Sequence, residues 1–149
     1  MTIDLLPFEI AETAHAIRRA FDRRAAHLGV TRAQWRVLAW LAREPGLRQV
    51  ELADHLDVEP ITLCRIIDRL QDGGMVERRR DPEDRRAWRL HLTETAMPLV
   101  EQLRRLAATM SAEAFDGLSP ETIDTVRAAL ARVRDNLATP AAAPKRISA

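Results

Sequence analysis

The chain has 149 residues, with 23 Lys and Arg against 22 Asp and Glu, so its formal net charge is +1. This length fits one ordinary domain, and a hydrophobic content of 46% suffices for a core, so a folded globular protein is expected. Near-neutral charge argues, taken alone, against a polyanion-binding protein, and the single cysteine, Cys64, excludes an internal disulfide and multi-cysteine zinc sites.

A long amphipathic helix is expected near the start of the chain. Apolar residues follow one another at steps of three or four over residues 10–28, which is the spacing of one helix face. Gly29 ends this helix, and Thr31 with Gln34 forms a capping box that begins a second helix. Pro45-Gly46 ends the second helix.

Residues 49–70 predict a helix-turn-helix. Asp57 stands in the turn where many such units have Gly, and Asp tolerates positive φ better than most residues. Pro60 suits the first position of the second helix. The first helix is expected to bury Val50, Leu52, Ala53 and Leu56, and the second Leu63, Ile66, Ile67 and Leu70.

The opposite face of the second helix presents Thr62, Arg65 and Arg69 at steps of three and four. In DNA-binding units the first turn of this helix reads base edges, and guanidinium groups bind guanine edges or phosphates. An ordinary solvated helix face is the alternative.

Two strands joined by a turn-rich loop are expected next, with the sequences VERRR, DPEDRR and AWRLHL. Residues 76–92 hold six arginines against four acids. A hairpin directly after a helix-turn-helix makes a winged helix, whose tip can place Arg85 or Arg86 in a narrow minor groove. Asp84 is expected to orient an arginine, either Arg65 or a wing arginine, through a charge-assisted hydrogen bond. The alternative is a solvated basic turn.

Helical spacing returns after the hairpin, from Leu99 to Met110 and again from Pro120 to Leu137. Ser119 provides an N-cap before Pro120. The apolar seams at the two ends of the chain need a partner. They can pack on each other in a monomeric bundle or against a second subunit across a two-fold interface, and the spacing alone favours neither.

The runs QVELADHLDVEPITLCRIIDRLQDGGMVERR and DPEDRRAWRLHLTETA resemble the MarR family of bacterial transcriptional regulators, and the likeness extends over about residues 10–137. The most specific motif is Asp84-Arg85-Arg86 in the wing. LTETAMPLV, GLSPE and the closing NL are similar to the SlyA-like branch of that family.

The resemblance implies a mainly α fold with a small β-hairpin wing, in a single domain over residues 1–149. The winged helix-turn-helix is expected at residues 32–93, and the dimerisation helices at residues 5–30 and 94–138. Residues 139–149 carry two prolines and no apolar stripe, so we expect a flexible tail.

The resemblance also implies a homodimer that binds a palindromic operator in double-stranded DNA, usually as a repressor, and it favours the dimer for the two seams. The helix from Pro60 would enter the major groove with Thr62 and Arg65 near bases. Arg86 resembles the minor-groove arginine of the family.

MarR relatives are commonly released from DNA by small aromatic acids that bind between the dimerisation helices and the winged helix. His15, Trp35 and Trp40 are our candidates to line such a pocket, because tryptophans can stack on an aromatic ring. The alternative is that both tryptophans are ordinary core residues.

A redox-responsive regulator would use Cys64, but no second cysteine can resolve an oxidised thiol, and a small core-facing thiol is the favoured role. A metal-responsive regulator has little support, because the four histidines are scattered. We expect neither a metal nor another cofactor.

No catalytic constellation or phosphate-binding glycine loop is present, so an enzyme is not expected. A winged-helix module for protein contact or non-specific DNA binding remains the competing function. No apolar run approaches the roughly 20 residues that span a bilayer, and the first ten residues do not resemble a signal peptide. We therefore expect a cytoplasmic, nucleoid-associated protein.

Overall fold

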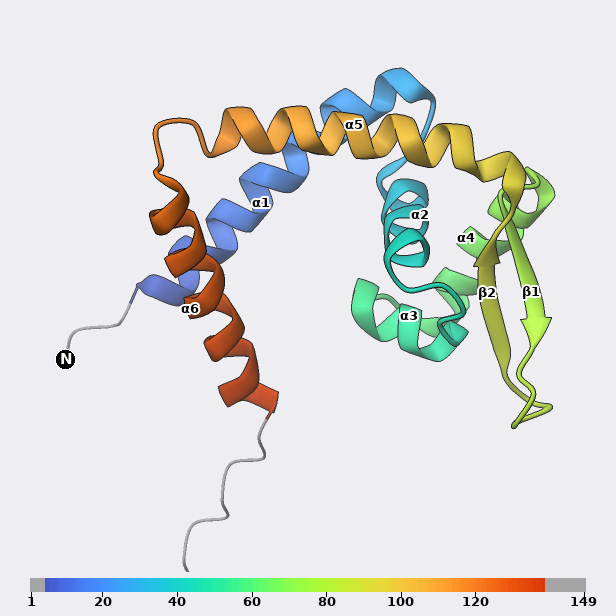
Figure 1. Cartoon of the computed structure of the whole chain (residues 1–149). Helices are drawn as coiled ribbons and strands as arrows, with labels where there is room; N and C mark the ends of the chain where they lie inside the picture. Colours follow the sequence, from blue (N-terminus) through green and yellow to red (C-terminus); the bar gives the residue numbers. More distant parts are fainter. Residues whose placement is uncertain (1–4, 139–149) are drawn as a thin grey trace, which may run out of the picture. The chain divides into compact units, whose positions relative to one another are not determined.

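The computed structural model describes residues 5–138, and the predicted tail at 139–149 lies outside them (Figure 1). The chain divides into two compact units, one ending at Ser111 and the other beginning at Ala112. Within the described residues there are six α-helices and one two-stranded antiparallel sheet. The expected fold class, mainly helical with a β-hairpin wing, is confirmed.

The first unit contains five helices, of which the last runs three residues into the second unit, and both strands. Their bounds are α1 (Leu6–Ala25), α2 (Arg32–Arg43), α3 (Gln49–Leu56), α4 (Pro60–Asp72), β1 (Val76–Arg80), β2 (Trp88–Leu92) and α5 (Met97–Ala114). Short 3-10 turns at Ala26–Leu28 and Glu94–Ala96 follow α1 and precede α5. The second unit contains α6 (Pro120–Ala138).

Local signals in the sequence set most helix boundaries. Thr31 accepts a hydrogen bond from the backbone N–H of Gln34, and the Gln34 side chain accepts one from the backbone of Thr31, so the predicted capping box is present. Gly29 adopts a φ of 75° after the 3-10 turn. Asp57 ends α3 with a φ of 51°, as expected for the turn of the helix-turn-helix.

The core of the first unit lies where α2, the helix-turn-helix and β2 meet. Its largest fully buried side chains are Leu38, Leu41, Leu52, Leu63, Ile67, Leu90, Val37 and Val76. Each contributes roughly 1.5–3 kcal/mol through removal of its side chain from water. Helices α1 and α5 add Phe21, Ala25, Val100 and Leu103 to the same cluster.

The expected burial of Val50 is wrong, because its side chain is 66% exposed. Leu52, Ala53 and Leu56 form the buried face of α3. At 100° per residue, Val50 points roughly 110° away from the centre of that face.

The loop between α2 and α3 forms backbone hydrogen bonds along the free edge of the hairpin. Strands β1 and β2 pair from Val76 opposite Leu92 to Arg80 opposite Trp88. On the other side of β2, the backbone N–H of Gly46 donates to the carbonyl of Leu90 over 3.0 Å, and the N–H of Leu90 donates to Leu47 over 2.9 Å. The wing is thereby joined to the residues that lead into α3.

Both ends of the described part of the chain present apolar side chains to solvent. On α1 and just before it these are Leu5, Leu6, Phe8 and Ile10. In the described part of the second unit, residues 112–138, α6 has no other complete helix or strand beside it, and its Val126, Leu130, Val133 and Leu137 are 36–80% exposed. None of the helices described between residues 5 and 138 has the length and hydrophobicity of a membrane span.

Candidate nucleic-acid interface

The exposed face of α4 carries the residues predicted for base and phosphate contact. Pro60 begins the helix, and Thr62, Arg65 and Arg69 follow on its exposed face. The guanidinium groups of Arg65 and Arg69 form no hydrogen bond or ion pair with the residues that the structure describes. They are therefore available to an anion or a base edge outside the chain.

Arg78, on β1, points toward the helix-turn-helix. Its Nη2 lies 2.7 Å from Oδ1 of Asp68, and its Nη1 donates to Oε1 of Gln71 over 2.6 Å. Its Nε donates to Oε1 of Gln49 over 3.3 Å. Through these contacts Arg78 joins β1 to both helices of the helix-turn-helix, and its side chain is only 16% exposed.

Two further arginines of β1 are engaged within the wing. Arg79 forms an ion pair with Glu77 on the same strand. Arg80 donates from Nη1 to the backbone carbonyl of Arg85 over 2.7 Å, and its guanidinium lies 4.6 Å from the centre of the Trp88 ring.

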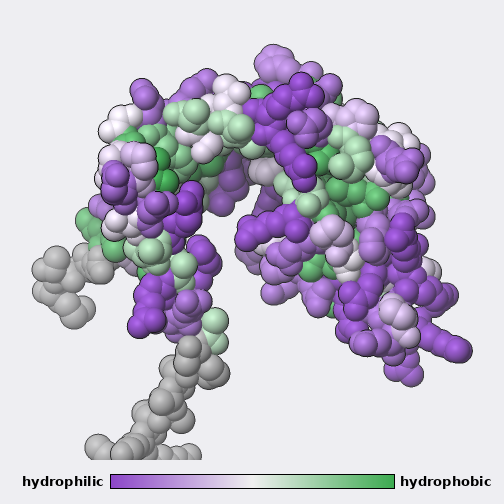
Figure 2. All heavy atoms as spheres, in the orientation of Figure 1, coloured by the Kyte–Doolittle hydropathy of each residue, from purple (hydrophilic) through white to green (hydrophobic). Residues whose placement is uncertain are grey.

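Arg85 and Arg86, in the loop between the strands, are both exposed. Among the described residues their guanidinium groups have no hydrogen-bond or ion-pair partner. Hydrophilic side chains cover this end of the hairpin in Figure 2. The wing loop therefore presents two unpaired positive charges to solvent.

Asp84 contacts Arg86 through the backbone. Its Oδ1 accepts the backbone N–H of Arg86 over 2.9 Å. The expected hydrogen bond to an arginine side chain, either that of Arg65 or that of a wing arginine, is not formed. An aspartate side chain reaches the N–H two residues further on within its own turn, and this local bond forms instead.

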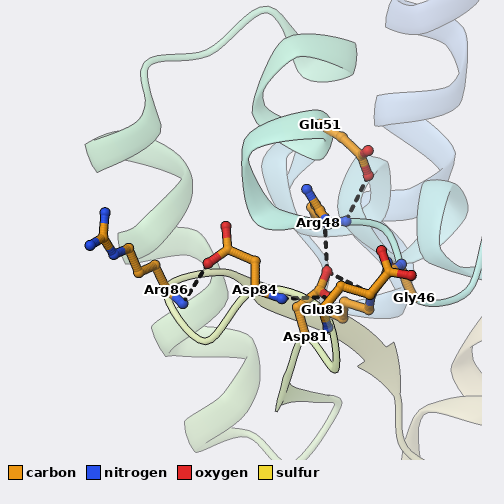
Figure 3. A network of polar contacts seen from close by, with 8 residues as sticks. Gly46, Arg48, Glu51, Asp81, Glu83, Asp84 and Arg86 are labelled. Carbon is orange, nitrogen blue, oxygen red and sulfur yellow. Dashed lines mark hydrogen bonds and ion pairs between the residues drawn. The ribbon is translucent and has the colours of Figure 1, made fainter.

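Asp81, which was not among the residues predicted from the sequence, is the one buried charged residue among those described. Its Oδ2 accepts from Nε of Arg48 over 2.8 Å (Figure 3). The same oxygen lies 2.9 Å from Nε of Arg89. Its Oδ1 accepts the backbone N–H groups of Glu83 and Asp84 over 2.8 and 3.3 Å. A signal was present, because an aspartate followed by proline at a strand end is typical of a side-chain-capped turn.

These contacts explain the ionisation of Asp81. The hydrogen bond from the backbone N–H of Glu83 lowers the pKa of the Asp81 carboxyl, and the guanidinium of Arg48 lowers it further against the opposing effect of burial. The carboxylate is therefore charged at neutral pH and can hold both arginines.

An apolar pocket of about 370 Å³ lies between α1, α2 and α5 of the first unit. Trp35 lines it and packs edge-on against Phe21, with ring centres 4.4 Å apart. Besides Ile17, Leu38, Ala39, Ala42, Val100, Leu103, Ala107 and Met110, the lining includes three exposed arginines, Arg18, Arg43 and Arg104. The walls are mostly apolar, and the three arginines are among the lining residues.

The comparisons with known proteins agree with this fold. The model of the MarR family matches residues 28–87. The transcriptional regulator PA3341 is 35% identical, with a TM-score of 0.82, and the match covers 89% of this chain and 97% of that one. The chain belongs to the MarR family.

Other structures of MarR-family proteins are similar to this one. A MarR-family transcriptional regulator from Silicibacter pomeroyi is 26% identical with a TM-score of 0.79, over 89% of each chain. A cysteine-to-serine mutant of MarR from E. coli, complexed with operator DNA, is 28% identical with a TM-score of 0.71. That match covers 86% of this chain and 92% of the other.

Only one of the three predicted pocket residues lines the pocket of this MarR-family chain. His15 is exposed on α1 and is not among the lining residues. Trp40 stacks on His55 with ring centres 4.3 Å apart, and Arg43 lies 5.6 Å from the Trp40 ring centre. His15, Trp35 and Trp40 therefore do not form one site.

Cys64 is half-buried on α4, and Nη2 of Arg78 lies 3.7 Å from its Sγ. A guanidinium from strand β1 therefore lies next to the thiol. Across residues 5–138, no three His, Cys, Asp or Glu side chains are grouped so that they could hold a metal ion.

Proposed function

We propose that this MarR-family chain is a homodimeric transcriptional regulator that binds a palindromic operator in double-stranded DNA. The observation that carries the proposal is that some arginines of the winged helix are exposed and unpaired, whereas others are bound within the fold. Arg65, Arg69, Arg85 and Arg86 are exposed without partners among the described residues, whereas Arg78 and Arg89 bind inside the fold. Unpaired guanidinium groups on the recognition helix and the wing suit phosphates and base edges.

In this proposal α4 enters the major groove from its N-terminal end. Pro60 sets the start of the helix, Thr62 and Arg65 lie near bases, and Arg69 lies nearer a phosphate. Arg86 enters the minor groove, where the negative potential is strongest, with Arg85 beside it. The sequence after the wing, LTETAMPLV, supports the SlyA-like branch of the family.

The apolar side chains that are exposed at the start of the first unit and along α6 support the dimer. A seam that includes Val126, Leu130 and Val133 needs a partner surface, and a second copy offers an identical one across a two-fold axis. Two winged helices would then read half-sites about one helical turn apart, ~34 Å. A dimer bound across a promoter blocks the polymerase, so we take the sign of regulation as repression.

The test is selection of duplexes from a random-sequence pool, followed by titration against a scrambled duplex. We expect the selected duplex to be palindromic and to bind roughly 10³-fold more tightly than the scrambled one at physiological salt. Equal affinity for both duplexes would identify a non-specific DNA-binding module. Sedimentation of the free protein should give a dimer, and Val133→Asp should give a monomer.

Two matched variants test the wing. Arg86→Ala should weaken binding to the selected duplex about tenfold or more and should reduce the salt dependence by about one counterion. Arg79→Ala removes the same charge from an arginine that is already paired with Glu77, so its effect should be smaller. Equal effects of the two variants would show that the wing contributes only general positive charge.

The effector in this proposal is a small aromatic or phenolic acid that binds in the pocket beside Trp35. The apolar lining suits the ring, and Arg18, Arg43 and Arg104 suit the carboxylate. Because the pocket is lined by α1, α2 and α5, a ligand there can change the spacing of the two recognition helices and release the operator.

A further inference from the structure

A chain of polar contacts runs from the start of α3 to the backbone of the wing loop (Figure 3). Arg48, the residue just before α3, donates from Nε to Oδ2 of Asp81 over 2.8 Å. The other oxygen of Asp81 accepts the backbone N–H of Asp84 over 3.3 Å. The side chain of Asp84 in turn accepts the backbone N–H of Arg86 over 2.9 Å.

The Arg48 end of this chain of contacts and its centre at Asp81 are fixed to other elements. The backbone N–H of Arg48 donates to Oε2 of Glu51 in the first turn of α3 over 2.9 Å. Arg89, whose Nε lies 2.9 Å from Asp81, donates from Nη1 to the carbonyl of Gly46 over 3.0 Å. The side chain of Asp81 is fully buried, so water does not compete for its contacts. The Arg86 side chain points away from the network, into solvent.

We propose that Asp81 is a positioning residue for DNA binding, which holds the wing loop against the start of α3 so that Arg86 meets the minor groove in a preset geometry. The inference rests on the proposed function of the chain. A loop that is ordered before binding does not lose its conformational freedom when it binds, so Asp81 strengthens binding without touching DNA. Arg48 and Arg89 contribute through the same carboxylate.

Asp81→Asn is the most informative variant. The asparagine oxygen still accepts the N–H groups of Glu83 and Asp84, but the amide group replaces a charged acceptor opposite the two arginines. The loop keeps its local turn and loses its attachment to Arg48. Glu83→Gln is the matched control, because it removes the same charge from an exposed side chain of the same loop.

The experiment is a double-mutant cycle with Arg86→Ala, measured as the dissociation constant for the duplex selected by the parent chain. Asp81→Asn should weaken binding about tenfold in the parent and less than about twofold in the Arg86→Ala background, because its effect passes through Arg86. Glu83→Gln should weaken binding in neither background. A general loss of folding would reduce affinity equally in both backgrounds.

Full additivity of Asp81→Asn and Arg86→Ala, or unchanged binding by Asp81→Asn, would overturn the proposal. If Asp81→Asn does not fold, Arg48→Gln removes one attachment from a partly exposed side chain, and the same non-additivity with Arg86→Ala is expected. If the parent selects no sequence, the proposed operator reading fails, and the cycle on a random duplex still decides whether Asp81 acts through Arg86.

Discussion

Trp35 donates its indole N–H to Oδ1 of Asp22 over 2.8 Å and so joins α2 to α1 beside the pocket. Asp22 also accepts from Nε of Arg32 over 2.6 Å. Burial raises the pKa of the Asp22 carboxyl, but the hydrogen bonds from Arg32 and Trp35 outweigh it, so the pKa lies below its ordinary value of 3.8. This aspartate holds a wall of the pocket in place.

Asp22→Asn should lower the free energy of unfolding by about 1 kcal/mol at pH 7, because a charged acceptor of two hydrogen bonds becomes neutral. A lowered carboxyl pKa stabilises the fold above the unfolded-state pKa, and this stabilisation is lost as the pH falls through the folded-state pKa. The difference between parent and variant, measured by urea unfolding, should therefore shrink below pH 4 or so. Asp124→Asn, in an exposed ion pair with Arg127, should change stability by less than about 0.5 kcal/mol.

Sequence patterns correctly predicted the features that depend only on residues close together in the chain. The capping box at Thr31, the turn at Asp57 and the helix start at Pro120 depend on neighbours in the chain, and each is present. The count of arginines in the wing did not predict which of them are free, because Arg78 pairs with Asp68 on another element. Asp81 contacts Arg48, which is 33 residues away, so no local pattern indicates the pair.

The predicted pocket residues also show that local patterns do not predict which side chains meet in the tertiary fold. Helical spacing placed Trp35 and Trp40 on the same helix, but five residues of an α-helix rotate the second side chain by about 140°. Trp35 faces α1 and the pocket, whereas Trp40 stacks on His55 of α3. The lining arginines come from three helices, and their meeting is a property of the tertiary fold.

Gly46→Ala tests the attachment of the loop before α3 to β2. Gly46 has a φ of 82°, and a Cβ there would lie 3.2 Å from Cε1 of His91. We expect the free energy of unfolding to fall by about 2–3 kcal/mol, from backbone strain together with displacement of His91. Gly29→Ala is the control, since Gly29 has a φ of 75° with open space around it, and it should cost only the strain, about 1 kcal/mol. Equal losses, measured by chemical denaturation, would show that His91 moves aside freely.

Ile61 gives a prediction about base reading that depends on the proposed function. It is 68% exposed in the first turn of α4, next to Thr62, where an apolar side chain can contact the methyl group of thymine. Replacement of one thymine by uracil in each half of the selected duplex should lower the affinity of the parent protein about fourfold per replaced base. This factor corresponds to the free energy of burying one methyl group. Ile61→Ala should bind the thymine and uracil duplexes equally, and Ile61→Val should still discriminate. Retained discrimination in Ile61→Ala would assign the thymine contact to another side chain.

The pocket can be filled without disturbance of the core. Ala39 lines it from the exposed side of α2, and Ala39→Leu keeps a good helix former while it occupies the space of a ring. The parent should melt at a higher temperature with 2-hydroxybenzoate, and less so with 2-hydroxybenzamide, because only the acid offers a carboxylate to Arg18, Arg43 and Arg104. Ala39→Leu should lose this shift, whereas Ala108→Leu, on α5 outside the pocket lining, should retain it. Equal shifts in melting temperature for the two variants would place the aromatic acid elsewhere on the protein. Equal shifts with the acid and the amide would show that the three arginines do not recognise the carboxylate.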